Sequence, residues 1–281
     1  MKSITYKHFT FFLLYPGISD FKSDIDYFGK FYDPDTRHWL FADFDRWFSD
    51  PGDSRAYVLL GDAGVGKSVL AAELVKRKRE DGSFGACYFC LGKDIIRSDP
   101  RNLIGTVAYQ LCKYNEEYRT KVGGERRVTT ILDNSALGCN ELFTKLLQEP
   151  LGQCDTYSKR RLVIIDALDE LNYKSRKDFL DLLLDRFPSL PKWLVFFITS
   201  RPEDTLQFNL KRYKPCITIC AGNGDDANYR QHEEDIRRFL VKKVKFSDLP
   251  YSVEDVVAKC NGMFLYAYYI SQELSDRTSS I

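Results

Sequence analysis

The sequence predicts an α/β fold in which helices flank a five-stranded parallel sheet, followed by a small all-helical subdomain. Three observations lead to this prediction. Five short apolar runs of strand type alternate with segments of helical periodicity. One of these runs, Leu162–Ile165, has four consecutive apolar residues, as expected for a parallel strand that is buried on both faces. Beyond Gly224 the strand pattern stops and only helical periodicity remains.

Composition excludes several classes of protein. The chain has 281 residues, 44% of them apolar and 14% aromatic, which is typical of a globular protein with a large core. Its 41 basic and 40 acidic residues give a net charge of +1, so we expect no nucleic acid and no membrane as partner. Among the eight cysteines, Cys87 and Cys90 would point to opposite faces of a strand. We therefore expect reduced thiols, no zinc site and a cytoplasmic protein.

The first 56 residues divide into a tail and a helix. Residues 1–34 have no clear period, and we expect a poorly ordered tail. Its apolar run, Phe9–Tyr15, is too short to span a membrane and lacks the cleavage site of a secretion signal. Residues 35–56 contain a leading helix that ends before Pro51. The apolar face of this helix comprises Trp39, Leu40, Phe41, Phe44, Trp47 and Phe48.

Residues 57–222 are the predicted sheet-containing core. The expected strands are Tyr57–Leu60, Phe84–Leu91, the run ending at Asp166, Leu194–Ile198 and Cys216–Cys220. Asp99 and Pro100 indicate the start of a helix after the second strand. Residues 121–135 are polar and contain glycine, so we expect a loop there.

Residues 223–281 are predicted to form the helical lid subdomain. Its expected helices cover residues 235–244, a segment begun by the capping box of Ser252 and Asp255, and residues 263–274. A second capping box, Ser175 and Asp178, is expected to begin the helix after the third strand.

The motif with the clearest chemistry joins the first strand to the helix behind it. Gly61, four further residues and then Gly66-Lys67-Ser68 have the spacing of a phosphate-binding loop in its strand–loop–helix context. Glycines allow φ > 0, so that consecutive N–H groups can approach phosphate oxygens at the positive end of the helix. We expect Lys67 to reach the β- and γ-phosphates and Ser68 to bind Mg²⁺. The predicted nucleotide-binding residues are Gly61, Asp62, Ala63, Gly64, Val65, Gly66, Lys67, Ser68 and Val69.

Three acidic residues follow the third strand. Asp166, at its carboxyl end, is the predicted Mg²⁺ partner, and Glu170 the residue that orients the attacking water. Asp169 is a further candidate for the metal and is interchangeable with Glu170 at this stage; alternatively, Asp169 and Glu170 cap the following turn. Arg201 ends the fourth strand, where a guanidinium can distinguish ATP from ADP and stabilise developing charge, or form only a surface salt bridge. The catalytic candidates are Lys67, Asp166, Glu170 and Arg201.

Three of these motifs together resemble a NACHT-type P-loop NTPase of the STAND class: Gly61–Ser68, Asp166–Glu170 and Thr199–Pro202. Trp39–Phe41 and Gly262–Ala267 in addition resemble the nephrocystin-like N-terminal NTPase module. The resemblance implies ATP as the nucleotide, a sheet ordered 5-1-4-3-2, a regulatory switch, and ring or disc assembly. Such proteins carry an effector domain before the NTPase and a winged helix and repeats after it. We therefore expect protein partners, or sensor and effector domains outside this sequence.

The leading hypothesis is an ATP-binding, slowly hydrolysing signalling switch, a weak ATPase that couples nucleotide state to conformation or oligomerisation. Three alternatives stay open on the sequence. They are a nucleotide-binding scaffold without turnover, a P-loop small-molecule kinase and a nucleic-acid motor.

Overall fold

The computed structural model describes residues 19–154, 159–220 and 227–278. The apolar run Phe9–Tyr15 lies outside the described residues, and so does the predicted boundary between the core and the helical lid at residues 222 and 223. That boundary stays a prediction.

The chain divides into two compact units, which we describe separately. The first unit consists of Met1–Tyr27 and Ala71–Ile198, and the second of Phe28–Leu70 and Thr199–Ile281. The division runs through the helix that follows the phosphate-binding loop and through the end of the fourth strand. It therefore differs from a simple succession of domains along the chain.

A five-stranded sheet has the order β2-β3-β4-β1-β5, which confirms the predicted fold class and sheet order. The strands are β1 (Ala56–Gly61), β2 (Phe84–Phe89), β3 (Arg161–Asp166), β4 (Leu194–Ser200) and β5 (Cys216–Ile219). The register is parallel: Ile164 of β3 lies opposite Cys87 of β2 and Phe197 of β4. All residues of β1, β2 and β4 are buried, which explains why they read as continuous apolar runs.

In the first unit, helices cover the strands and one another. They are α2 (Lys22–Gly29) and α4 (Lys67–Glu80), whose residues 28–29 and 67–70 belong to the second unit, and α5 (Pro100–Tyr114), α6 (Glu116–Val122), α7 (Gly124–Leu132), α8 (Cys139–Phe143), the π-helix η1 (Thr144–Gln148), α9 (Glu149–Gly152), the 3-10 helices η2 (Leu168–Glu170) and η3 (Phe187–Ser189), and α10 (Tyr173–Asp185). Helix α5 packs on β2. As predicted, Asp99 caps α5, with its side chain accepting from the Arg101 N–H at 2.8 Å, and Pro100 is the first helical residue.

The loop predicted for residues 121–135 is wrong. Helices α6 and α7 occupy most of this segment, and they pack against each other. Gly123 and Gly124 adopt φ of +84° and +80°, so the glycines form a sharp break between two helices and not a loop. Val128 and Leu132 are the buried face of α7. The capping box expected at Ser175 is also wrong, because α10 begins earlier and its cap is Asn172, which accepts from the Lys174 N–H at 3.0 Å.

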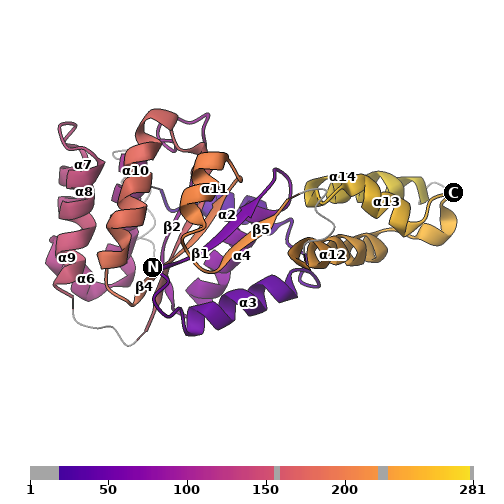
Figure 1. Cartoon of the computed structure of the whole chain (residues 1–281), viewed down its shortest axis with the longest axis horizontal. Helices are drawn as coiled ribbons and strands as arrows, with labels where there is room; N and C mark the ends of the chain where they lie inside the picture. Colours follow the sequence, from indigo (N-terminus) through magenta and orange to yellow (C-terminus); the bar gives the residue numbers. More distant parts are fainter. Residues whose placement is uncertain (1–18, 155–158, 221–226, 279–281) are drawn as a thin grey trace, which may run out of the picture. The chain divides into compact units, whose positions relative to one another are not determined.

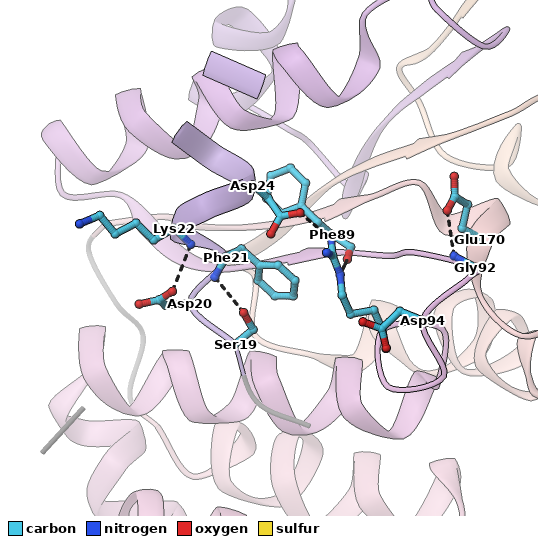
Figure 2. A network of polar contacts seen from close by, with 10 residues as sticks. Ser19, Asp20, Phe21, Lys22, Asp24, Phe89, Gly92, Asp94 and Glu170 are labelled. Atoms are coloured by element: carbon cyan, nitrogen blue, oxygen red, sulfur yellow. Dashed lines mark hydrogen bonds and ion pairs between the residues drawn. The ribbon is translucent and has the colours of Figure 1, made fainter. Parts of the chain in front are cut away.

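The N-terminal segment is more ordered than the tail we expected, as far as it is described. Phe21 is 2% exposed, and its ring lies 5.1 Å from the ring of Tyr88. Asp24 on α2 pairs with Arg97 at 2.8 Å. Figure 2 shows Phe21 and Asp24 beside Phe89 at the end of β2. A single aromatic anchor of this kind leaves no periodic pattern in the sequence, which is why the segment reads as a tail.

The second unit combines β1 and β5 with helices from both ends of the chain. These are α3 (His38–Ser49), α11 (Asp204–Leu210), α12 (Ala227–Lys243), the 3-10 helix η4 (Phe246–Asp248), α13 (Val253–Cys260) and α14 (Phe264–Thr278). The aromatic face predicted for the leading helix packs around Tyr57 of β1, with the rings of Phe44 and Trp47 at 5.5 and 5.6 Å.

Helices α12, α13 and α14 pack on one another (Figure 1). They share an apolar core that includes Ile236, Leu240 and Cys260. The predicted capping box of Ser252 and Asp255 begins α13. None of the helices among the described residues is long and apolar enough to cross a membrane.

Candidate nucleotide-binding site

The predicted phosphate-binding loop lies in the second unit, between β1 and α4. Gly64 and Gly66 have φ of +80° and +96°, values that only glycine adopts without strain. At Gly61 the reason for glycine is space, since a Cβ atom would lie 3.0 Å from the Ile219 carbonyl oxygen. Helix α4 begins at once, with the Leu70 N–H donating to the Gly66 carbonyl at 3.1 Å. The loop therefore leads directly into a helix N-terminus, the arrangement that binds phosphate groups.

Lys67 is the first residue of α4. Its ammonium donates to the carbonyls of Gly61 at 2.6 Å and Asp62 at 3.0 Å, and so it is held against the loop. There its charge adds to the positive end of the helix dipole. Ser68 lies in the first turn of the same helix and is partly exposed.

The predicted acidic site belongs to the first unit and begins at the end of β3. Asp166 is 2% exposed, and its carbonyl accepts from the Cys90 N–H at 3.0 Å. Ala167 then takes a left-handed conformation, with φ 56° and ψ 52°, which is unfavourable for a residue with a Cβ atom. This turn places Asp169 and Glu170 in the short helix η2, directly behind the strand.

Glu170 contacts the loop that follows β2. Its Oε2 accepts from the Gly92 N–H at 2.8 Å, as Figure 2 shows. Asp169 is fixed through its backbone, since its carbonyl accepts from the Arg176 guanidinium at 2.7 Å. Neither residue is the cap of α10, which is Asn172.

The donor set at the end of β3 fits Mg²⁺. Burial raises the pKa of the Cys90 thiol well above its usual value, and the charges of Asp166, Asp169 and Glu170 raise it further. Negative charge is thus concentrated there on oxygen atoms, the ligands that Mg²⁺ prefers. Among the described residues no three His, Cys, Asp or Glu side chains form a metal cage by themselves. Mg²⁺ in such sites binds through one or two carboxylates and keeps several waters.

Arg201 follows β4 and belongs to the second unit. Its side chain is exposed, whereas Thr199 and Ser200 before it are fully buried. Its role in sensing the nucleotide stays a prediction.

The sequence reasoning missed a buried polar cluster beside the phosphate-binding loop. Arg37, the residue before α3, is 4% exposed, and its guanidinium donates to the Val65 carbonyl and to Nδ1 of His232. Because arginine can only donate, Nδ1 must be the acceptor, so His232 is neutral and carries its proton on Nε2. This Nε2–H donates to the Gly262 carbonyl at 2.6 Å.

Asp235 completes the cluster, with its carboxylate accepting from Nε1 of Trp39 at 2.9 Å. Burial lowers the pKa of Arg37 to about 10, an effect that the charge of Asp235 opposes. Burial raises the pKa of Asp235, and the charge of Arg37 opposes that shift. Arg37 and His232 are 195 positions apart in the sequence, and no local pattern connects them. Only the short motif around Trp39 pointed to this region.

His232 makes the stability of the protein depend on pH. Burial first, and then the charge of Arg37, lower the pKa of His232 to about 3, whereas the Gly262 carbonyl opposes the shift. The rings of Tyr229 on α12 and Phe264 on α14 also lie beside the imidazole, with centroids at 6.3 and 5.9 Å. In the unfolded chain His232 is protonated below about pH 6.5, whereas in the folded chain it stays neutral down to about pH 3. This contribution to stability is therefore complete above pH 6.5 and is lost as the pH falls toward 3.

Below about pH 6.5 we expect His232 to lower the free energy of unfolding by about 1.4 kcal/mol per pH unit. At pH 5 its effect should amount to about 2 kcal/mol relative to neutral pH. Denaturant unfolding of wild type and His232→Asn at pH 7.5 and pH 5.0 measures it. The variant should lose about 2 kcal/mol less than wild type between the two pH values. An equal loss in both proteins would show that His232 is not kept neutral.

Fold and loop together define the class of this protein. A parallel sheet of order β2-β3-β4-β1-β5, with a Gly-x-x-x-x-Gly-Lys-Ser loop between β1 and α4, is the architecture of a P-loop NTPase. The family described as nephrocystin 3, N-terminal, matches residues 35–201. Because this match covers more than half of the 281 residues, the chain belongs to that family.

No curated protein matches the chain. Among solved structures, the Walker-type ATPase PABY2304 of Pyrococcus abyssi is similar, with 15% sequence identity and a TM-score of 0.47. The similarity covers 84% of this chain and 66% of that one, so this chain spans less than two thirds of its length.

Proposed function

We propose that this protein is an ATP-binding, slowly hydrolysing switch module of the NACHT/STAND type, which acts in signal transduction in the cytoplasm. The observation that carries the proposal is the phosphate-binding loop, with two glycines at positive φ and the Lys67 ammonium held at the N-terminus of α4. Backbone N–H groups, a helix dipole and a fixed cation together form a site for a polyphosphate.

Each candidate residue has a proposed role in this site. Lys67 binds the β- and γ-phosphates, and Ser68 and Asp166 hold Mg²⁺, which neutralises charge on the transferred phosphoryl group. Glu170 orients the attacking water, and Arg201 contacts the terminal phosphate and so distinguishes ATP from ADP. Asp169 remains a second candidate for the metal.

The switch is supported by contacts between the phosphate-binding loop and the C-terminal helices, all of them within the second unit. The Leu265 N–H at the start of α14 donates to the Gly64 carbonyl at 3.0 Å. A nucleotide shifts a conformational equilibrium only by the difference between its affinities for the two states. A loop that is bonded to these helices can provide such a difference. We propose protein partners and assembly of several copies as the output, and no nucleic acid, because the net charge is only +1.

A nucleotide-binding scaffold without turnover is the second candidate. One observation favours it: the Glu170 carboxylate already accepts a hydrogen bond from the Gly92 N–H, which competes with a water molecule for that oxygen.

The test is to denature the purified protein, identify the nucleotide that it releases, and measure steady-state ATP hydrolysis. We expect ADP or ATP at about one per chain, and a turnover far below 10 s⁻¹, the median value for enzymes. Protein that is folded but empty, and that fails to bind added ATP with Mg²⁺, would contradict nucleotide binding. Turnover at or above the enzyme median would contradict a switch.

A further inference from the structure

We propose that Arg37 is a positioning residue of the phosphate-binding loop, and that its pairing with His232 makes the nucleotide affinity of the loop depend on helices α12 and α14. This inference rests on the proposed function, because it concerns the regulation of the same site. It assigns a role to a cluster outside the predicted binding residues.

Two successive carbonyls of the loop are tethered from outside it. The Gly64 carbonyl accepts from the Leu265 N–H, and the Val65 carbonyl accepts from the Arg37 guanidinium. In a planar trans peptide, the carbonyl of one residue and the N–H of the next point in opposite directions. Fixing these two carbonyls therefore fixes the directions of the Val65 and Gly66 N–H groups. These are N–H groups that a phosphate-binding loop directs at its anion.

Glycine makes this tethering necessary. Gly64 and Gly66, at φ of +80° and +96°, give the loop its shape but also leave it the most conformational freedom when it is not restrained. A site that is not preorganised must lose that freedom on binding the nucleotide, which lowers its affinity. The two external hydrogen bonds restrain the loop before any nucleotide binds.

Arg37 is held in place by residues of the C-terminal helices. Its guanidinium lies 4.7 Å above the ring of Phe264, the first residue of α14, and it donates to His232 on α12. His232 in turn donates to the carbonyl of Gly262, just before α14. The route from the loop to both helices therefore consists of one arginine, one neutral histidine and one backbone carbonyl, all buried. When α12 or α14 moves, Arg37 loses its partners, and the Val65 carbonyl loses its tether.

Substitutions of His232 can separate the hydrogen bond of Nδ1 to Arg37 from that of Nε2 to Gly262. Asparagine places an oxygen near the position of Nδ1 and so keeps an acceptor for Arg37, whereas glutamine places an N–H₂ near Nε2 and keeps only the donor to Gly262. Arg37→Lys retains the charge but loses the fork that reaches two acceptors at once. The matched control is Trp39→Phe, which removes the hydrogen bond to Asp235 in the same cluster and leaves the loop contacts intact.

The experiment measures the affinity for ADP with Mg²⁺ by calorimetry in Arg37→Lys, His232→Gln, His232→Asn and Trp39→Phe, with thermal unfolding of each. We expect Arg37→Lys and His232→Gln to weaken binding by about 5- to 150-fold, the usual range of coupling between sites. A double variant, Arg37→Lys with His232→Gln, should bind ADP no more weakly than Arg37→Lys alone, because both substitutions break the same link. His232→Asn and Trp39→Phe should stay within about threefold of wild type, even where their unfolding temperature falls.

A second measurement needs no nucleotide. Amide hydrogen exchange of the loop peptide that covers residues 61–70 should be faster in Arg37→Lys and His232→Gln than in Trp39→Phe. If wild type binds no nucleotide, the proposed function fails, and the exchange rates still decide whether Arg37 positions the loop. Exchange that is equal in all variants, or an affinity that follows stability in all four, would overturn the inference.

Discussion

Replacing Lys67 with alanine is expected to empty the protein of nucleotide and to weaken its binding of ATP with Mg²⁺ by about 30-fold to several thousand-fold. The loss of one partner of a hydrogen-bonded charge pair costs about 2–5 kcal/mol, which is a factor of about 30 to several thousand. Lys67 is the only cation of the predicted nucleotide-binding residues. Its ammonium is already positioned by the Gly61 and Asp62 carbonyls, so no reorganisation offsets its interaction with phosphate.

The fold should tolerate this change. Lys67 is partly exposed, and the two carbonyls that it contacts can bind water in its place. The matched control is Lys76→Ala, the same substitution nine positions further along α4 and away from the loop. Calorimetric titration of both variants and quantification of the nucleotide they release measure the effect. An affinity of Lys67→Ala within a few fold of the Lys76→Ala value would show that the loop does not bind phosphate in the way we propose.

The strands of the sheet could be predicted from the sequence because the signal for each strand lies within its own residues. A parallel strand that is buried on both faces must be apolar at every position, so runs such as Leu162–Ile165 and Leu194–Ile198 are visible without any knowledge of their neighbours. The order of the strands is not local, and it followed only from the resemblance carried by the three motifs. Helix α7 was missed because Gly123 and Gly124 read as a loop, although they are the break between two helices.

The candidate site likewise contains residues that a local sequence pattern identifies and residues that no local pattern identifies. The loop residues were identified by a spacing that belongs to one contiguous strand–loop–helix unit. Arg37 and His232 could not be identified, because a buried arginine and a solvent-exposed one look alike in a sequence. Their hydrogen bond joins positions 195 apart. The contact of Glu170 with Gly92 was equally hidden, since it joins the ends of two neighbouring strands across 78 positions.

The second large effect that we expect is the loss of ATP hydrolysis on substitution of Glu170, the residue that accepts a hydrogen bond from the Gly92 N–H. Glu170→Gln should lower ATP hydrolysis by about 100- to 10,000-fold, the usual contribution of a general base, and leave the affinity for ATP with Mg²⁺ unchanged. Glutamine keeps an oxygen that can accept from the Gly92 N–H, so the loop after β2 stays in place. It lacks the negative charge that orients and deprotonates water. Binding and hydrolysis are therefore separated by a single substitution.

Asp169→Asn is the matched variant, because Asp169 is the neighbouring acid that the sequence could not distinguish from Glu170. In the structure Asp169 is fixed through its backbone carbonyl by Arg176, a contact that the substitution retains. Single-turnover hydrolysis of radiolabelled ATP, measured in both variants at equal occupancy, assigns the role. A large loss in Asp169→Asn alone would transfer the role of base to Asp169. If wild type and both variants hydrolyse ATP no faster than a solution without protein, then Asp169 and Glu170 contribute nothing to turnover, and the scaffold replaces the switch as the function of this module.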